Sequence, residues 1–406
     1  MIFQFFMLKK SFGSVPVHLV KGFIQKCIAT PLILTIEMLI IEKFYNIFKN
    51  LCAEKIDSVI KSKLRIFKVV DKIIINNLQV ILLFIAIIAF NAKFSLYNFV
   101  VDEIQKNIAL RSSISAEKVK ITANNPKNLI LIYMESMEDT YKRENLFGIN
   151  LLADLDNIKG VSFASYKQSH ATGWTIAGIF ATQCGKYIEV NFSTMEGICL
   201  SDVLAKQGYY NVFMGGTSLE FTKKGEFFHN HQYHELYGRE EWQKNGVKDI
   251  YEWGAYDEDV FRGAKKWLKE LHDKRDLFNL TILTGDTHAP DGYLSKYCKQ
   301  KGASSLYDIV KCSAEQVADF IEFVKQNGYL DDTNIVVIGD HLFPIDTKVA
   351  NIKKSKRYIF NRFISKEEPI KEREEIVHFD LFPTILDYIG LKVEGGRLGI
   401  GRSAFK

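Results

Sequence analysis

Apolar side chains follow two different patterns along this chain, and the change falls near residue 127. Before that point they gather in long runs, and residues 73–91, IIINNLQVILLFIAIIAFN, carry no charged side chain. A helix of this length crosses a hydrocarbon core of roughly 30 Å, so we predict a transmembrane helix over 73–91. An earlier run, 27–41, is interrupted by Glu37 and predicts either a second span or an interfacial helix.

The charges that precede this segment predict its orientation. Residues 55–72 carry six basic side chains against two Asp, so that side is expected to be cytoplasmic and the rest of the chain to face outward. No A-x-A cleavage pattern follows a short apolar region, which favours a retained anchor over a removable signal peptide. We expect a membrane anchor region over 1–91 with one or two helices, a linker helix over 92–126 and an extracytoplasmic catalytic domain over 127–406.

From Lys127 onward, short apolar strands alternate with amphipathic helical stretches. The strands are expected at 128–134, 209–215, 277–283 and 334–339, and the helices after Thr175 and near 201–207, 259–272 and 313–326. This alternation predicts an α/β fold with a parallel-rich sheet flanked by helices on both faces. Ligands of such sheets bind beyond the carboxyl ends of the strands, so the residues there are the candidates for function.

Three of these strands end in side chains that bind metals or phosphate. Glu135 follows the first strand, the run Gly285-Asp286-Thr287-His288 follows the third, and Asp340-His341 follow the fourth. Each alone could be a helix cap or a surface residue. Two carboxylates and an imidazole at one sheet edge instead predict a divalent site suited to Mn²⁺, Mg²⁺ or Zn²⁺.

A hydroxyl-rich turn is a further candidate. In the segment 169–178, SHATGWTIAG, Gly173 permits a tight turn and the apolar residues after it predict a helix that begins near Thr175. A hydroxyl at a helix N-terminus lies where backbone N–H groups favour an alkoxide and phosphoryl oxygens. The alternative is that Thr175 or Thr172 only caps that helix, and the residues alone favour this alternative.

The other histidines receive a simpler interpretation. His229, His231 and His234 are spaced so that one helix face cannot hold all three, and we expect them at the surface. His378 is expected to begin the C-terminal helix, and His170 precedes the hydroxyl-rich turn.

Charge and cysteine content narrow the function classes. The net charge of +5 is small and the basic residues are scattered among acidic ones, which argues against a nucleic-acid partner. Of six Cys, the later four form two sequence-local pairs, Cys184 with Cys199 and Cys298 with Cys312, and none has zinc-finger spacing. Two disulfides are expected in an oxidising compartment and four free thiols in the cytosol, and the predicted topology favours the disulfides.

Five segments in order resemble the motifs of the alkaline-phosphatase/sulfatase superfamily. They are NLILIYMESMEDTY (128–141), TGWTIAG (172–178) with ATQCG (181–185), GDTHAPDGYLS (285–295), VVIGDH (336–341) and HFDLFPTILDYIGL (378–391). The resemblance covers 127–406 and is greatest to membrane-bound phosphoglycerol transferases that act on periplasmic glucans. Lipoteichoic acid synthases and lipid A phosphoethanolamine transferases are more distant.

This resemblance implies roles for individual residues. It implies that Glu135, Thr175, Asp340 and His341 hold one catalytic metal, commonly Mn²⁺, and that Thr175 is the nucleophile. It implies that His288 contacts the transferred phosphate and that the four later cysteines form the two disulfides named above. Phe221 and Lys223, in GGTSLEFTKKGEFF (215–228), fall roughly where relatives bind the phosphoglycerol headgroup, and the alternative is a plain surface loop.

Two departures from the motifs of related proteins narrow the range of expected reactions. True sulfatases carry C-x-P-x-R at the nucleophile, whereas here Gly185 and Lys186 follow Cys184 and the nucleophile position holds Thr175, which disfavours sulfate-ester hydrolysis. Closer relatives also tend to have Ile-Pro after Cys-Gly, where this chain has Lys186-Tyr187.

The expected reaction is transfer of phosphoglycerol from phosphatidylglycerol to a glycan through a covalent phospho-threonine, at the outer face of a bacterial cytoplasmic membrane. The alternatives are a phosphoethanolamine transferase acting on lipid A or a surface glycan, and a non-catalytic binding protein of the same fold.

Overall fold

A computed structural model describes residues 112–188, 197–344 and 356–406, together with a few isolated residues elsewhere. Contacts divide the chain into two units, and these three ranges belong to the unit that contains Ile108–Lys406. The predicted transmembrane segment 73–91 lies, apart from Ile88, outside the described residues. Within the described part of the chain, the helices are too short or too polar to cross a membrane.

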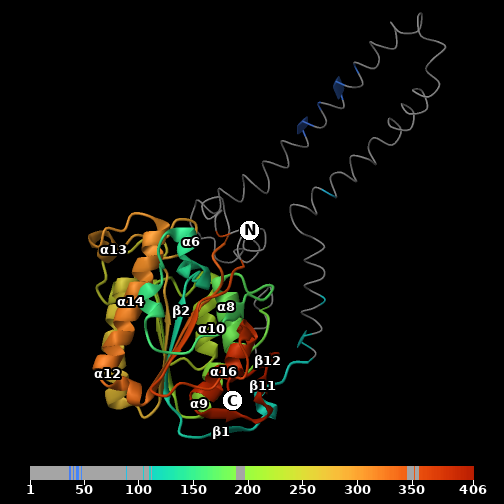
Figure 1. Cartoon of the computed structure of the whole chain (residues 1–406), viewed down its shortest axis with the longest axis vertical. Coiled ribbons are helices and arrows are strands. Elements are labelled where there is room, and N and C mark those ends of the chain that lie inside the picture. The colour runs from blue at the N-terminus through green and yellow to red at the C-terminus, as the bar shows by residue number, and fades with distance from the viewer. Residues whose placement is uncertain are drawn as a thin grey trace, which may run out of the picture. The chain divides into compact units, whose positions relative to one another are not determined.

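The domain is built on a six-stranded sheet with the order β5-β4-β6-β2-β7-β8. All neighbouring strands are parallel except β8, which runs antiparallel to β7 (Figure 1). The strands are β2 (Asn128–Met134), β4 (Tyr210–Gly215), β5 (Glu235–Tyr237), β6 (Phe278–Leu283), β7 (Thr333–Gly339) and β8 (Asn361–Ile364). The predicted α/β fold with a parallel-rich sheet is confirmed, and all four predicted strands form.

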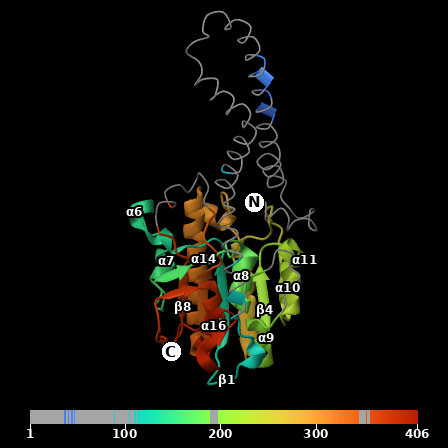
Figure 2. The ribbon, with the colours of Figure 1, turned by 90° about the vertical axis from the view of Figure 1, so that its right-hand side faces the viewer.

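Alternate side chains of β2 enter two separate cores. Leu129, Leu131 and Tyr133 pack with one face of the sheet, and their neighbours Ile130 and Ile132 with the other. The first face is covered by α8 (Thr175–Cys184), α9 (Leu200–Lys206), α10 (Lys224–Asn230) and α16 (Leu381–Tyr388). The second is covered by α7 (Ala153–Asp156), α11 (Arg239–Lys244), α12 (Asp257–Lys274) and α14 (Leu306–Gln326). Figure 1 shows α12 and α14 on one side of β2, and Figure 2 looks onto the side that carries α8, α9 and α16.

Two of the predicted helices are longer than their sequence pattern indicated. The stretch predicted at 259–272 is α12, and the one predicted at 313–326 is the end of α14, which begins seven residues earlier. The earlier start is fixed by a capping box, in which the Ser305 hydroxyl accepts from the Asp308 N–H and the Asp308 carboxylate accepts from the Ser305 N–H.

Shorter elements complete the domain. They are α6 (Glu144–Phe147), α13 (Lys296–Gln300), the 3₁₀ turns η4 (Ala116–Lys118), η5 (Asp139–Lys142), η6 (Phe221–Lys223), η7 (Tyr329–Asp331), η9 (His378–Asp380) and η10 (Glu394–Gly396), and three strand pairs. The pairs are β1 (Ile121–Ala123) with β10 (Leu391–Val393), β3 (Ser165–Lys167) with β9 (Glu375–Val377), and β11 (Arg397–Leu398) with β12 (Gly401–Arg402).

One prediction needs correction. The linker helix was expected to extend to residue 126, but 112–126 holds η4 and β1 rather than an α-helix. Ile121 pairs with Val393 of β10, and its side chain packs against the core, so the tertiary pairing outweighs the local helical preference.

Candidate active site

The carboxyl ends of three adjacent strands bring the predicted polar residues together. β2 lies between β6 and β7, with Tyr133 opposite Leu283 and Met134 opposite Gly339. Glu135 therefore emerges beside Asp340. The loop after β6 holds the Glu135 backbone from the other side, since the Thr284 hydroxyl accepts from its N–H at 2.9 Å and the Thr287 hydroxyl donates to its carbonyl at 2.5 Å.

Two buried carboxylates and one imidazole converge at this point. His341 Nε2 lies 3.4 Å from Glu135 Oε1 and 3.5 Å from Asp340 Oδ2. Ser136 joins the two carboxylates, because its hydroxyl donates to Glu135 Oε1 at 2.7 Å and its backbone N–H to Asp340 Oδ1 at 2.8 Å. All four residues are almost fully shielded from solvent.

The donor set fits a divalent cation. His341 Nδ1 lies 2.8 Å from the Leu342 carbonyl, an arrangement that leaves Nε2 free to coordinate, and the ligand atoms of Glu135, Asp340 and His341 lie within 4.8 Å of one another. Asp340 Oδ2 is buried and has no hydrogen-bond partner among the described residues. Burial, and then the Glu135 charge, raise the pKa of Asp340 well above its usual range. A bound cation would compensate both the orphaned oxygen and this repulsion.

The Glu135 carboxyl behaves differently from its neighbour. Burial alone raises its pKa, but the nearby imidazoles of His341 and His288 and the hydroxyls of Ser136 and Thr175 outweigh burial and hold the pKa below the usual value. Glu135 is therefore the ionised member of the carboxylate pair.

Thr175 does not act as a helix cap. It is the first residue of α8, the N-cap is Trp174, and the Thr175 hydroxyl donates to Glu135 Oε2 at 3.0 Å. Thr172, the other candidate cap, donates instead to the Ser169 carbonyl at 2.7 Å. The Thr175 hydroxyl thus lies in the carboxylate cluster, next to first-turn N–H groups that have no partner within the helix.

The α8 backbone packs directly on the segment that carries Asp340. A Cβ added at Gly178 would lie 2.1 Å from the Asp340 carbonyl oxygen. His378, fully buried, has Nε2 2.8 Å from the same carbonyl and Nδ1 3.2 Å from the Thr172 hydroxyl. Burial lowers the pKa of His378 to about 4, so the ring is neutral, its Nε2–H donates to the Asp340 carbonyl, and the ring lies against the turn before Thr175.

His288 lies near Glu135 and belongs to an aromatic group. Its Nδ1 is 2.9 Å from the Ala289 carbonyl, which leaves Nε2 for a substrate, and its ring lies 4.7 Å from that of Trp253. Phe221 contacts the other side of this group, with its ring 4.8 Å from Trp253. Lys223 forms an ion pair with Glu226 at 3.2 Å. The structure therefore brings Phe221 to the site through Trp253, and directs Lys223, the last residue of η6, to Glu226 of the following helix α10.

Two residues beside the site were not predicted, Trp253 and Lys224. Lys224 is 3% exposed, and its ammonium donates to the Thr217 hydroxyl. Burial lowers its pKa to about 8, while the charges of Glu135, Glu240 and Asp340 oppose that shift. Lys224 shares the buried face of α10 with Phe227 and Phe228, so the helical period indicates a buried position there but not a buried charge.

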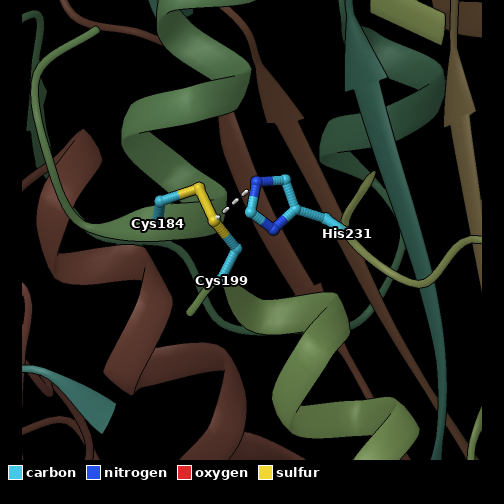
Figure 3. A group of neighbouring side chains, drawn as sticks. All are labelled: Cys184, Cys199 and His231. Atoms are coloured by element: carbon cyan, nitrogen blue, oxygen red, sulfur yellow. Dashed lines mark hydrogen bonds between the residues drawn. A yellow bond between two sulfur atoms is a disulfide. The ribbon is translucent and has the colours of Figure 1, made fainter. Parts of the chain in front are cut away.

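The two predicted disulfides are present, Cys184–Cys199 and Cys298–Cys312. The first joins the end of α8 to the start of α9, and Figure 3 shows the His231 ring directed at it, with Nε2 3.7 Å from Cys199 Sγ. His231 was expected at the surface, but it is 4% exposed because its Nδ1 contacts the Asp202 carboxylate at 2.7 Å. Since both sulfurs are bonded to each other, this cluster holds no free thiolate for a metal.

Comparison with known proteins places these residues in a family. The profile described as Sulfatase matches residues 127–391, which include every candidate catalytic and metal-binding residue. The chain belongs to the sulfatase family. Its relatives include phosphoglycerol transferase I of Escherichia coli O6:K15:H31, 35% identical over 310 residues, and that of Salmonella paratyphi B, 34% identical over 309. Each alignment covers 70% of this chain but only 40% of the relative, so the chain spans well under half of their length.

Solved structures agree on the fold. A protein of the alkaline phosphatase superfamily from Vibrio parahaemolyticus aligns with TM-score 0.55 and 21% identity, covering 73% of this chain and 76% of that one. The lipoteichoic acid synthase LtaP from Listeria monocytogenes aligns with TM-score 0.56 and 18% identity, covering 70% and 78%. The sheet and its flanking helices therefore share the fold of these two structures.

Proposed function

We propose that this protein transfers a phosphoglycerol group from a membrane phospholipid, phosphatidylglycerol, to an extracytoplasmic glycan. The observation that carries the proposal is the Thr175 hydroxyl, placed at the first turn of α8 and hydrogen-bonded to Glu135 within a buried cluster of metal-binding type. The relatives named phosphoglycerol transferase I support the choice of phosphoglycerol as the transferred group.

The metal site in this proposal consists of Glu135, Thr175, Asp340 and His341. We propose Mn²⁺ as its occupant, with Mg²⁺ and Zn²⁺ as alternatives that accept the same oxygen and imidazole ligands. A bound dication supplies positive charge beside the Thr175 oxygen, which lowers the free-energy cost of its ionisation.

The residues of the chain then divide the chemistry between them. Thr175 Oγ1 attacks the phosphorus of the headgroup and passes its proton to Glu135 Oε2, the acceptor of its hydrogen bond. Diacylglycerol leaves, and the phosphoglyceryl group remains on Thr175. His288 Nε2 donates a proton to the leaving alkoxide and accepts one from the acceptor hydroxyl that later attacks the phosphorus. The Lys224 ammonium, buried near Glu135 and Asp340, offsets negative charge on the phosphoryl oxygens. Trp253 and Phe221 form the wall against which the glycerol would lie.

The location belongs to the same proposal. We propose that 73–91 anchors the chain in a bacterial cytoplasmic membrane and that the catalytic domain faces the periplasm. The two disulfides support an oxidising compartment. An anchor also keeps the domain close to its lipid donor.

The decisive experiment is the intact mass of the full-length protein after exposure to vesicles. With phosphatidylglycerol and Mn²⁺ we expect an adduct of one phosphoglyceryl group that is absent in Thr175→Ala and present in Thr122→Ala, a threonine exposed on β1. Phosphatidylethanolamine in a parallel sample tests the phosphoethanolamine alternative. Absence of an adduct with both lipids would refute covalent headgroup transfer, and an adduct with phosphatidylethanolamine alone would replace the proposed donor.

A further inference from the structure

A groove of about 450 Å³ begins two residues after His288. One wall is the loop that contains Pro290, Gly292 and Leu294, and the other is the start of α14 with Ser304, Leu306 and Tyr307. Its volume falls within the roughly 300–1,000 Å³ of ligand-binding pockets. None of the steps proposed above uses this groove.

The groove and His288 belong to one rigid unit. The Gly292 N–H donates to the His288 carbonyl at 3.0 Å. Gly292 has a φ of +70°, a conformation that favours glycine, and a Cβ there would lie 3.0 Å from Ile309 Cδ1 and 3.3 Å from Leu306 Cδ1. The loop therefore packs directly on α14, so a molecule bound in the groove contacts the same loop that carries the catalytic imidazole.

The groove also opens at the catalytic edge of the sheet. Its loop follows β6 and its helix precedes β7, and in such a crossover the helix N-terminus lies at the carboxyl ends of the strands. Thr175, at the N-terminus of α8, lies at that edge too. In Figure 1, α13, which joins the two walls, appears at the same end of the domain as α6, which follows β2.

The side chains that line the groove exclude an anionic headgroup as its ligand. Among the described residues that line the groove none is basic, and Asp291 is the one with a carboxylate. Behind the rim, hydrogen bonds from the Ser304 N–H and the Ser305 hydroxyl lower the pKa of the Asp308 carboxyl, which adds a second negative charge. A phosphate would need Arg or Lys here. Carboxylate and serine oxygens beside Leu306 and the amphipathic Tyr307 instead suit the hydroxyls and apolar ring faces of a sugar.

We propose that this groove binds the acceptor, a neutral polyhydroxylated chain of the carbohydrate class. The proposal rests on the transferase function proposed above. An acceptor hydroxyl oxygen bonds to the phosphorus of phosphoglyceryl-Thr175 while the bond from phosphorus to Thr175 Oγ1 breaks. The proton of that hydroxyl passes to His288 Nε2, and the proton held by Glu135 Oε2 returns to Thr175 Oγ1.

The test fills the groove in the full-length protein. Ser304 is exposed, so Ser304→Trp should fold and occupy the space, and Gln326→Trp, exposed at the other end of α14, is the matched control. With phosphatidylglycerol vesicles and a neutral gluco-oligosaccharide, we expect the ratio of transfer to adduct formation to fall at least tenfold in Ser304→Trp, through a higher KM for the oligosaccharide. Gln326→Trp should match the wild type.

Three outcomes would overturn the proposal. The first is a ratio that stays at the wild-type value. The second is a fall in adduct formation as large as the fall in transfer, which would assign the groove to the donor. The third is the same loss in Gln326→Trp. Should the wild type form no adduct, the transferase function fails, and the groove is then tested by calorimetry of the oligosaccharide with Thr175→Ala. If Thr175→Ala binds the oligosaccharide and the added Ser304→Trp abolishes this binding, the result supports the groove as the acceptor site. Absence of binding to Thr175→Ala refutes the proposal.

Discussion

At the scale of single residues, the site is distinguished by buried charges that lack a full set of partners. Lys224 is the clearest case, because an ammonium has three donors and the only hydrogen bond described for it runs to Thr217. Burying a charge in this way is costly unless a ligand completes its contacts. The residue is therefore expected to matter more for binding the donor than for the stability of the fold.

Replacing Lys224 by Met should raise the donor KM. A hydrogen bond to a charged group contributes about 1.5–3 kcal/mol, so a rise of roughly tenfold to a hundredfold is expected at pH 7. In the wild type the KM should increase as pH rises through about 8, where Lys224 loses its proton, and in Lys224→Met this limb should be absent. Steady-state kinetics across pH 6–10 measure both effects. Lys244→Met, exposed on α11, should retain the wild-type profile.

Burial of Lys224 also predicts the direction in which folding stability changes with pH. The pKa of Lys224 is about 8 in the folded protein and about 10.5 when unfolded, so between these values the unfolded chain binds more protons and stability rises with pH. Denaturant unfolding at pH 7 and pH 10 should detect this rise in the wild type and its loss in Lys224→Met. An identical pH dependence in the two proteins would contradict the burial of a charged Lys224.

A second pair of buried carboxyls lies behind the His288 loop. Asp257 accepts from the Gly285 N–H at 2.6 Å, Asp286 accepts from the Asp257 N–H at 3.1 Å, and Asp286 Oδ2 has no partner among the described residues. Burial raises the pKa of Asp257 to about 7, and burial with the Asp257 charge raises that of Asp286 well above its usual range. Burial therefore favours the protonated, uncharged form of these two carboxyls.

Asp286→Asn should stabilise the protein in neutral and mildly alkaline solution. With a raised folded-state pKa, the stability contributed by the carboxyl pair is complete below about pH 3.8 and is lost as pH rises through about 7. The amide removes one charge and replaces the orphaned oxygen by a donor, so a gain of about 1–3 kcal/mol is expected at pH 8. Denaturant unfolding at pH 4 and pH 8 should show the gain growing with pH, and the exposed Asp273→Asn should show none. A loss of stability at pH 8 would mean that the folded protein needs the negative charge of Asp286.

At the scale of secondary structure, the site depends on the contact between α8 and the segment after β7. The position of Thr175 relative to Asp340 is set by the missing side chain of Gly178, because a methyl group there would meet the Asp340 carbonyl. His378 holds the same carbonyl from the other side. One backbone oxygen therefore fixes the distance between the helix that carries the proposed nucleophile and two of the proposed metal ligands.

Gly178→Ala should separate folding from metal binding. Overpacking of this kind costs about 1–3 kcal/mol, and relief of the clash must move either α8 or the Asp340 segment. We expect Mn²⁺ affinity, measured by the electron paramagnetic resonance signal of the free ion, to fall at least tenfold. Ala177→Gly, one residue earlier and equally buried, costs about 1 kcal/mol through helix propensity and should retain its Mn²⁺ affinity. Normal Mn²⁺ binding by Gly178→Ala would show that this contact does not position the ligands.

The elements also explain which features the sequence could predict. β2 and β7 were located to within one residue because each is a wholly buried apolar run. β5 was missed because its three residues are only partly buried, and β8 because Asn361 and Arg362 break the apolar pattern. Glu135 and Asp340 followed from the strand ends alone.

The roles of Thr175 and Lys224 depend on contacts that no local pattern encodes. The carboxylate that binds the Thr175 hydroxyl lies forty residues earlier in the chain, so from its neighbours alone this threonine is indistinguishable from a cap. Lys224 was missed because an amphipathic period does not predict a buried charge. Its burial depends on how α10 packs against the sheet.

At the scale of the whole molecule, the compartment determines whether the domain keeps its two covalent links. Cys184–Cys199 and Cys298–Cys312 close sequence separations of 15 and 14 residues. Chain-entropy reasoning assigns about 3 kcal/mol to a loop of this size, so an oxidising compartment contributes a large part of a domain's usual stability. This links the stability of the domain to the membrane topology predicted from the charges before residue 73.

Thiol counting on the full-length protein tests this link. Purified under conditions that block exchange, unfolded without reductant and labelled with a maleimide, the chain should gain two labels, at Cys27 and Cys52, and after reduction it should gain six. A Cys27→Ser/Cys52→Ser double variant should gain none before reduction and four after it. Six labels without reductant would place the domain in a reducing compartment and overturn the outward orientation, because thiols that mature outside the cytoplasm would be oxidised.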